Sequence, residues 1–211
     1  MLTAALLGFL LGLRHASDPD HVVAISTIVT RHRSPWAASR VGVAWGLGHS
    51  LTIVAVGGAV VALGLALPPR LALSLELLVG IVLVALGVSN LRSASKAPHA
   101  PDVGNDVGSV APLGRAFFVG LVHGLAGSAA VALLALAAMP GPAAAILYLA
   151  IFSLGTVAGM VAISLGVGAP LALASGSSPV QRLIVAGSGA LSLGLGLWVV
   201  WRIGFTQGIL L

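Results

Sequence analysis

The sequence contains no cysteine and very little charge. Only 7% of its 211 residues are charged, and just five of these are acidic. The lack of cysteine excludes disulfides, thiolate metal ligands and a thiol-redox membrane carrier. A soluble domain carries about 25% charged residues, so this chain has too few of them to cover a water-facing surface. With 58% hydrophobic residues, the composition predicts an integral membrane protein.

Two other classes of function lack their sequence signals. The formal net charge is +5, but the basic residues are few, lie mostly between apolar runs and are not interleaved with aromatics. This placement fits the positive-inside rule better than nucleic-acid binding. No phosphate-cradling G-x-x-x-x-G-K-[ST] sequence occurs, so an ATP-driven pump is not expected. We expect neither an enzyme nor an organic cofactor.

Six apolar stretches are long enough to cross a bilayer, which takes about 20 residues. Proline- and glycine-rich turns separate most of them. We therefore predict an all-α, polytopic membrane protein with six transmembrane helices in one integrated domain. The predicted spans cover residues 2–29, 41–67, 71–91, 113–139, 143–173 and 180–203.

The chain divides into two halves of three spans, residues 1–92 and 113–211, joined by a flexible linker at 93–112. Three short matches relate the halves at an offset of 107 or 108 residues. Because each half has an odd number of spans, the second enters the membrane from the opposite side, which predicts an inverted repeat of the kind found in secondary transporters. The matches pair residues 12–15 with 120–123, residues 45–48 with 152–155, and Gly80 and Gly87 with Gly187 and Gly194.

The distribution of lysine and arginine predicts the orientation in the cytoplasmic membrane. One side of the predicted topology carries seven of these residues and the other carries Arg70 and Arg202. The positive-inside rule places the richer side, with linker 93–112, in the cytoplasm and the N-terminus outside. The seven are Arg31, Arg33, Arg40, Arg92, Lys96, Arg115 and Arg182.

The first predicted span carries the cluster RHASDPDH at residues 14–21, with two of the five acidic residues of the chain. Charged side chains cost several kcal/mol in a bilayer, so such a cluster indicates a functional site. Pro19 has no N–H and its ring clashes with the carbonyl of His15, so the helix should kink or unwind between them. A break lets the polar side chains converge on one ion, with imidazole and carboxylate ligands that suit Ni, Co or Zn. The candidate ligands here are His15, Asp18, Asp20 and His21.

Two more histidines fall at the level of this cluster in the predicted topology. At about 1.5 Å per helical residue, His21 and His49 lie about 13 Å from the cytoplasmic ends of their spans, and His123 lies about 15 Å deep. His15 is expected about 9 Å further out than His21 on the same scale. This arrangement predicts a short pathway, with an outer part at His15 and Asp18 and an inner part level with His49.

Plainer structural roles are open for several of these residues. Arg14 and Asp18 are spaced i, i+4 and are able to neutralise each other. His49 and His123 are also suited to structural hydrogen bonds between helices. Glu76, near the outer end of the third span, fits an assignment to the headgroup region.

The sequence of residues 14–21 resembles the RHAxDADH signature of the nickel/cobalt transporter (NiCoT/NicO) family. Residues 46–50 (GLGHS) look like the next signature of that family, and residues 120–130 (GLVHGLAGSAA) resemble its shorter branch, similar to urease accessory protein H. The resemblance implies metal-binding roles for His15, Asp18, Asp20, His21 and His49, with His123 carried over from the shorter branch. Pro19 stands where the family usually has alanine, and the acidic residues of longer members in later spans are missing.

The function implied is uptake of Ni(II) or Co(II), as transported substrate, across the cytoplasmic membrane by alternating access. Two alternatives stay open. One is export of the same metals by proton exchange. The other is an accessory membrane subunit that delivers nickel to urease or hydrogenase maturation, with cytoplasmic nickel metallochaperones as partners.

Overall fold

The computed structural model describes residues 2–30, 34–65, 68–95, 110–173 and 178–209. These ranges are helical and contain no strand, so the predicted all-α class is confirmed. The elements are α1 (Leu2–His15), α2 (Pro19–Val29), α3 (Pro35–Thr52), the π-helix η1 (Ile53–Gly57), α4 (Gly58–Leu63), α5 (Pro69–Ser95), α6 (Val110–Ala138), α7 (Pro142–Leu173), α8 (Ser178–Trp201) and the π-helix η2 (Arg202–Thr206).

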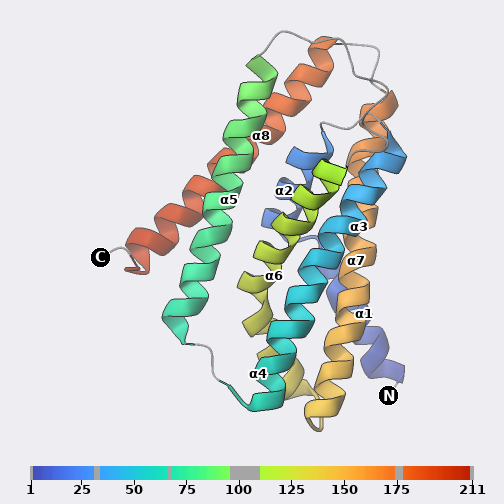
Figure 1. The fold of residues 1–211 in the computed structure, drawn as a ribbon, viewed down its shortest axis with the longest axis vertical. Coiled ribbons are helices and arrows are strands. Elements are labelled where there is room, and N and C mark those ends of the chain that lie inside the picture. The colour runs from blue at the N-terminus through green and yellow to red at the C-terminus, as the bar shows by residue number, and fades with distance from the viewer. Residues whose placement is uncertain (1, 31–33, 66–67, 96–109, 174–177, 210–211) are drawn as a thin grey trace.

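The helices form a bundle in which consecutive long helices run in opposite directions (Figure 1). Helix α3 packs against α6 and α7, and α7 also packs along α1. Helices α5 and α8 cross each other on one side of the bundle (Figure 1). The short helix α2 contacts α8, α7 and α5, so it lies between this crossed pair and the other helices.

The break in the first predicted span occurs where Pro19 requires it. Helix α1 ends at His15, and α2 begins at Pro19, which occupies a first-turn position where its missing N–H costs nothing. Asp18 has an extended backbone (φ −60°, ψ 141°), the conformation that a following proline favours. The predicted interruption is confirmed, and it turns one long span into two short helices.

Other helix ends differ from the predicted spans. Helix α3 begins at Pro35 rather than near residue 41, again with proline in its first turn. Helices α5 and α6 extend over residues 93–95 and 110–112 of the predicted linker. The rest of that linker, 96–109, lies outside the described residues.

The lengths and surface of these helices are those of a helical membrane protein. Within the described ranges, four segments are long and apolar enough to cross a bilayer: Pro35–Leu63, Pro69–Ser95, Pro142–Pro170 and Pro179–Thr206. Large apolar side chains such as Leu51, Ile81, Leu154 and Leu183 are exposed on the outside of the bundle. Exposed apolar surface of this extent indicates contact with lipid.

Glycines allow the closest helix crossings. At the α1–α7 crossing, a methyl group on Gly12 would overlap the carbonyl oxygen of Phe152, and one on Gly155 would overlap that of Phe9. At the α3–α6 crossing, Gly120 and Gly48 stand in the same relation to the carbonyl oxygens of Trp45 and Phe117. Only glycine lets the backbones approach this closely.

A buried polar network fixes α2 against the α5–α8 pair. The Asn90 side-chain amide donates to the carbonyl oxygen of Thr27 at 2.9 Å and to the Ser188 hydroxyl at 3.2 Å. The Thr30 hydroxyl lies 3.4 Å from that of Ser188. All four residues are buried, so the network closes the bundle on the side of α2 away from Pro19.

Candidate metal centre

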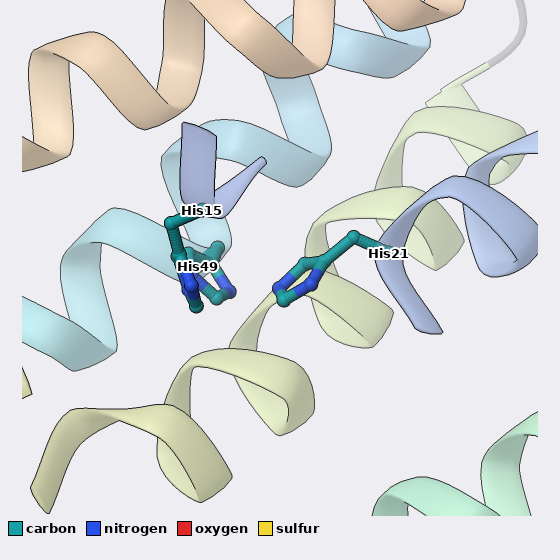
Figure 2. A group of neighbouring side chains, drawn as sticks. All are labelled: His15, His21 and His49. Carbon is teal, nitrogen blue, oxygen red and sulfur yellow. The ribbon is translucent and has the colours of Figure 1, made fainter. Parts of the chain in front are cut away.

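Three imidazole rings from three helices meet inside the bundle. His15 ends α1, His21 lies in the first turn of α2, and His49 lies in the last turn of α3. Their side chains point toward one another (Figure 2), and one nitrogen from each lies within 4.8 Å of the others. The Nε2 atoms of His15 and His49 are 3.2 Å apart. Three imidazoles converging in this way form a candidate site for a divalent transition metal.

Two carboxylates orient two of these rings from behind. Nδ1 of His15 is 2.8 Å from Asp18 Oδ2, and Nδ1 of His21 is 3.2 Å from Asp20 Oδ1. When Nδ1–H donates to the carboxylate, the Nε2 lone pair faces the cluster. This is the carboxylate–histidine arrangement that fixes the tautomer of metal-ligating histidines.

A fourth histidine lies next to the three. The ring centroid of His123 on α6 is 5.6 Å from that of His21. Its Nδ1–H donates to the carbonyl oxygen of Val119 at 3.0 Å, which leaves Nε2 as the acceptor. His123 is 2% exposed, and its Nε2 has no hydrogen-bond partner.

The same lack of partners marks the centre of the cluster. His21 and His49 are 4% and 0% exposed, yet His21 Nε2 and His49 Nδ1 have no hydrogen-bond partner. A buried polar atom without a partner is costly, and its presence requires an explanation such as an ion or a functional role. Nitrogen lone pairs facing each other in a buried space are suited to a cation.

A cavity of about 380 Å³ connects this cluster to the surface. The cavity is lined by His15, Asp18, Asp20, His21 and His123, and also by residues of α5 and of the α8–η2 segment. Of the latter, Glu76 and Arg202 are 42% and 40% exposed. The cluster is therefore reached from the side where α5 begins and α8 ends.

The structure brings all six predicted site residues into one neighbourhood, but in a different arrangement from the one predicted. The ring centroids of His15 and His21 are only 4.8 Å apart. The predicted separation of about 9 Å, with an outer and an inner part, is therefore wrong. That value assumed helical rise across residues 16–18, where the chain instead leaves the helix and α2 returns His21 to the end of α1. The expected Arg14–Asp18 pair is also wrong, because Asp18 pairs with His15.

Sequence reasoning missed the aromatic walls and the cavity mouth. The rings of Phe152 and Trp45 lie 5.3 Å from His15 and 5.4 Å from His123. Both belong to the repeat match at 45–48 and 152–155, which is the signal that pointed to them. Glu76 lines the cavity and was predicted to be a headgroup contact. Its signal was the scarcity of acidic residues, since only five occur in the chain.

Fold and site together define a helical membrane protein with a buried histidine–aspartate cluster of the kind that binds transition metals. Residues 1–91 match the family described as "NicO: High-affinity nickel-transport protein". The chain is 32% identical to urease accessory protein UreH of Bacillus sp. (strain TB-90), over 99% of this chain and 95% of that protein. The chain belongs to the NicO nickel-transport family.

Two plant proteins are also similar. These are the chloroplast proteins FOR GROWTH AND FERTILITY 1 and 2 of Arabidopsis thaliana, which are 31% and 30% identical to this chain. The chain spans 59% and 56% of their lengths. No solved structure matches.

Proposed function

We propose that this protein is a secondary transporter that takes up Ni(II) or Co(II) across the cytoplasmic membrane. The observation that carries the proposal is the convergence of His15, His21 and His49 within 4.8 Å at the end of a cavity that opens on one side of the bundle. Membership of the NicO nickel-transport family supports nickel as substrate. Imidazole and carboxylate ligands exchange more readily than a closed thiolate cage, which suits transport.

In this proposal the three imidazoles hold the ion. Tetrahedral nitrogens at about 2.0–2.1 Å from a metal are about 3.4 Å apart, so small side-chain movements close the cluster around it. Asp18 and Asp20 hold the tautomers of His15 and His21 and supply negative charge. His123 Nε2 offers the next donor.

The architecture proposed is six spans in two inverted repeats. Contacts support this, because the two repeats exchange equivalent partners: His15 lies against Phe152 and His123 lies against Trp45, pairs related by offsets of 108 and 107. The glycine crossings at Gly12 and Gly120 follow the same exchange. Such symmetry provides the two related conformations that alternating access requires.

The glycine contacts refine the third pair of spans. Space is open at Gly187 and Gly194, whereas Gly189 and Gly196 of α8 pack against Gly87 and Gly80 of α5. An offset of 109 makes these two contacts exchange partners. We therefore favour 109 for this pair, in place of the 107 suggested by the sequence.

The membrane potential is sufficient to drive uptake. With the N-terminus outside, the cavity faces outward, and the Asn90 network closes the cytoplasmic side. A divalent cation moving inward gains about 4.6 kcal/mol per 100 mV, which corresponds to about a 10³-fold accumulation. Export would have to work against this gradient by proton exchange.

The accessory function is a second candidate, because the bacterial relative is named a urease accessory protein. In that case the chain would hand nickel to cytoplasmic metallochaperones, and the purified protein alone would bind metal without transporting it. Metal flux is therefore the property that separates the two functions.

The test is Ni(II) and Co(II) uptake into liposomes that contain the purified protein. We expect uptake driven by an inside-negative potential, absent from protein-free liposomes. An absence of flux with metal still bound favours the accessory function. Flux that requires an opposing proton gradient and proceeds in the outward direction favours export.

Replacing Asp20 with alanine is expected to weaken Ni(II) binding by about 10- to 100-fold, the range typical of a lost outer-shell partner. The substitution removes the acceptor for His21 Nδ1 and one negative charge. Asp20→Asn, which keeps an acceptor oxygen, should lose less. Titration calorimetry in detergent measures both, and wild-type affinity in Asp20→Ala would contradict the orienting role.

A further inference from the structure

All three acidic residues in the described ranges line the same cavity. Asp18 and Asp20 are beside the histidines, and Glu76 lies on α5 near the cavity mouth. A carboxylate of Glu76 is paired with Arg202 at 3.4 Å, from Nη2 to Oε2. In a chain with so few acidic residues, placing three of them in one cavity indicates that the cavity attracts cations.

We propose that Glu76 is an outer binding site for a hydrated divalent cation, with Arg202 as its exchangeable counter-ion. This inference rests on the proposed transport function. It adds a capture site before the histidine cluster. An arriving cation takes the place of Arg202 at the Glu76 carboxylate and then moves inward to the imidazoles.

The Glu76–Arg202 pair is better suited to exchange than to structural support. The two side chains are 42% and 40% exposed, and they share one contact of 3.4 Å. Ion pairs this exposed contribute little to stability. Arg202 has a second partner, since its guanidinium carbon lies 4.8 Å from the centroid of the Trp198 ring. The Trp198 face can therefore hold the guanidinium when Glu76 binds a cation.

The size and walls of the cavity fit a cation that still carries its water shell. At about 30 Å³ per water, the cavity of about 380 Å³ has room for a divalent ion with six waters. A carboxylate binds such an ion through its water shell, whereas the imidazoles require direct contact. Val79, Leu195 and Val199 line the wall between these two sites. Their apolar surface leaves the carboxylates as the attractive groups along the path.

The opposing explanation is that the pair clamps α5 to the end of α8. The two explanations differ in the sign of one effect. If Glu76 captures cations, Glu76→Gln raises the KM for Ni(II) and Arg202→Gln lowers it, because the second change frees the carboxylate and removes a positive charge. If the pair is a clamp, both substitutions impair transport in the same direction.

The experiment measures initial rates of Ni(II) uptake into liposomes at low and high ionic strength. We expect KM to rise about three- to tenfold in Glu76→Gln and to fall by a similar factor in Arg202→Gln at low salt, with kcat little changed. Both shifts should shrink as salt screens the mouth. Arg202→Lys keeps the charge and should behave like the wild type. Shifts of equal sign, or no shift in Glu76→Gln, would overturn the proposal.

Two controls keep the result interpretable. Should Arg202→Gln fail to fold, the salt dependence of Glu76→Gln decides, and a KM unaffected by salt in both that variant and the wild type contradicts capture. Equilibrium Ni(II) binding separates this inference from the transport function. In His21→Ala, a weak site that disappears on adding Glu76→Gln supports the capture site even without flux, and a weak site unaffected by that change counts against it.

Discussion

His21→Ala is expected to abolish metal uptake and to weaken Ni(II) binding by more than about 100-fold. Loss of an outer-shell partner already costs about 10- to 100-fold, and this substitution removes a ligand. His21 contacts every other member of the cluster, with ring centroids 4.8 Å from His15, 4.9 Å from His49 and 5.6 Å from His123. Its removal leaves two imidazoles on one side and one on the other.

Binding and flux should be measured on the same preparation of His21→Ala. His32→Ala is the matched control, since the sequence places it beside Arg31 and Arg33 rather than in the cluster, and it should transport like the wild type. Unchanged thermal stability in detergent would show that the loss is local to the site. Equal transport by His21→Ala and the wild type would refute the site assignment.

Gly120→Ala is expected to prevent correct assembly of the bundle and, with it, metal binding. A methyl group there would overlap both the carbonyl oxygen and the ring of Trp45, and it would lie 3.0 Å from the backbone nitrogen of His49. Relief requires α3 and α6 to move apart, and backbone overlap of this kind costs at least about 1–3 kcal/mol. The movement also takes His49 and His123 away from each other.

The chain supplies both a positive and a negative control for this substitution. Gly194→Ala, also within a helix, has open space around the added methyl group and should be stable. Gly12→Ala places a methyl group at the equivalent crossing of α1 and α7, so it should be as damaging as Gly120→Ala. Thermal unfolding in detergent and Ni(II) titration measure both properties. A Gly120→Ala protein with wild-type stability would contradict the close crossing.

The sequence was sufficient to predict what single residues impose on their own neighbourhood. Pro19 predicted the end of α1 and the start of α2, because a missing N–H and a steric clash act locally. The levels of His49 and His123 were also predicted, since helical rise is regular within an uninterrupted helix. These local rules placed all six candidate residues in one region.

The arrangement across the break was beyond such rules. How α2 turns back toward α1 depends on packing against α5, α7 and α8, which no periodicity encodes, so the distance between His15 and His21 was overestimated. The roles of Asp18 and Asp20 at the Nδ1 atoms required side-chain geometry. The pairing of Glu76 with Arg202, 126 residues apart, depends on the crossing of α5 and α8.

X-ray absorption spectroscopy of Ni(II) bound to the purified protein tests the central claim most directly, because it reports the atoms around the metal. The account predicts a shell with at least three imidazole nitrogens and no sulfur, and the loss of imidazole scattering in His21→Ala. A shell of oxygen atoms alone that is unchanged in His21→Ala would contradict it.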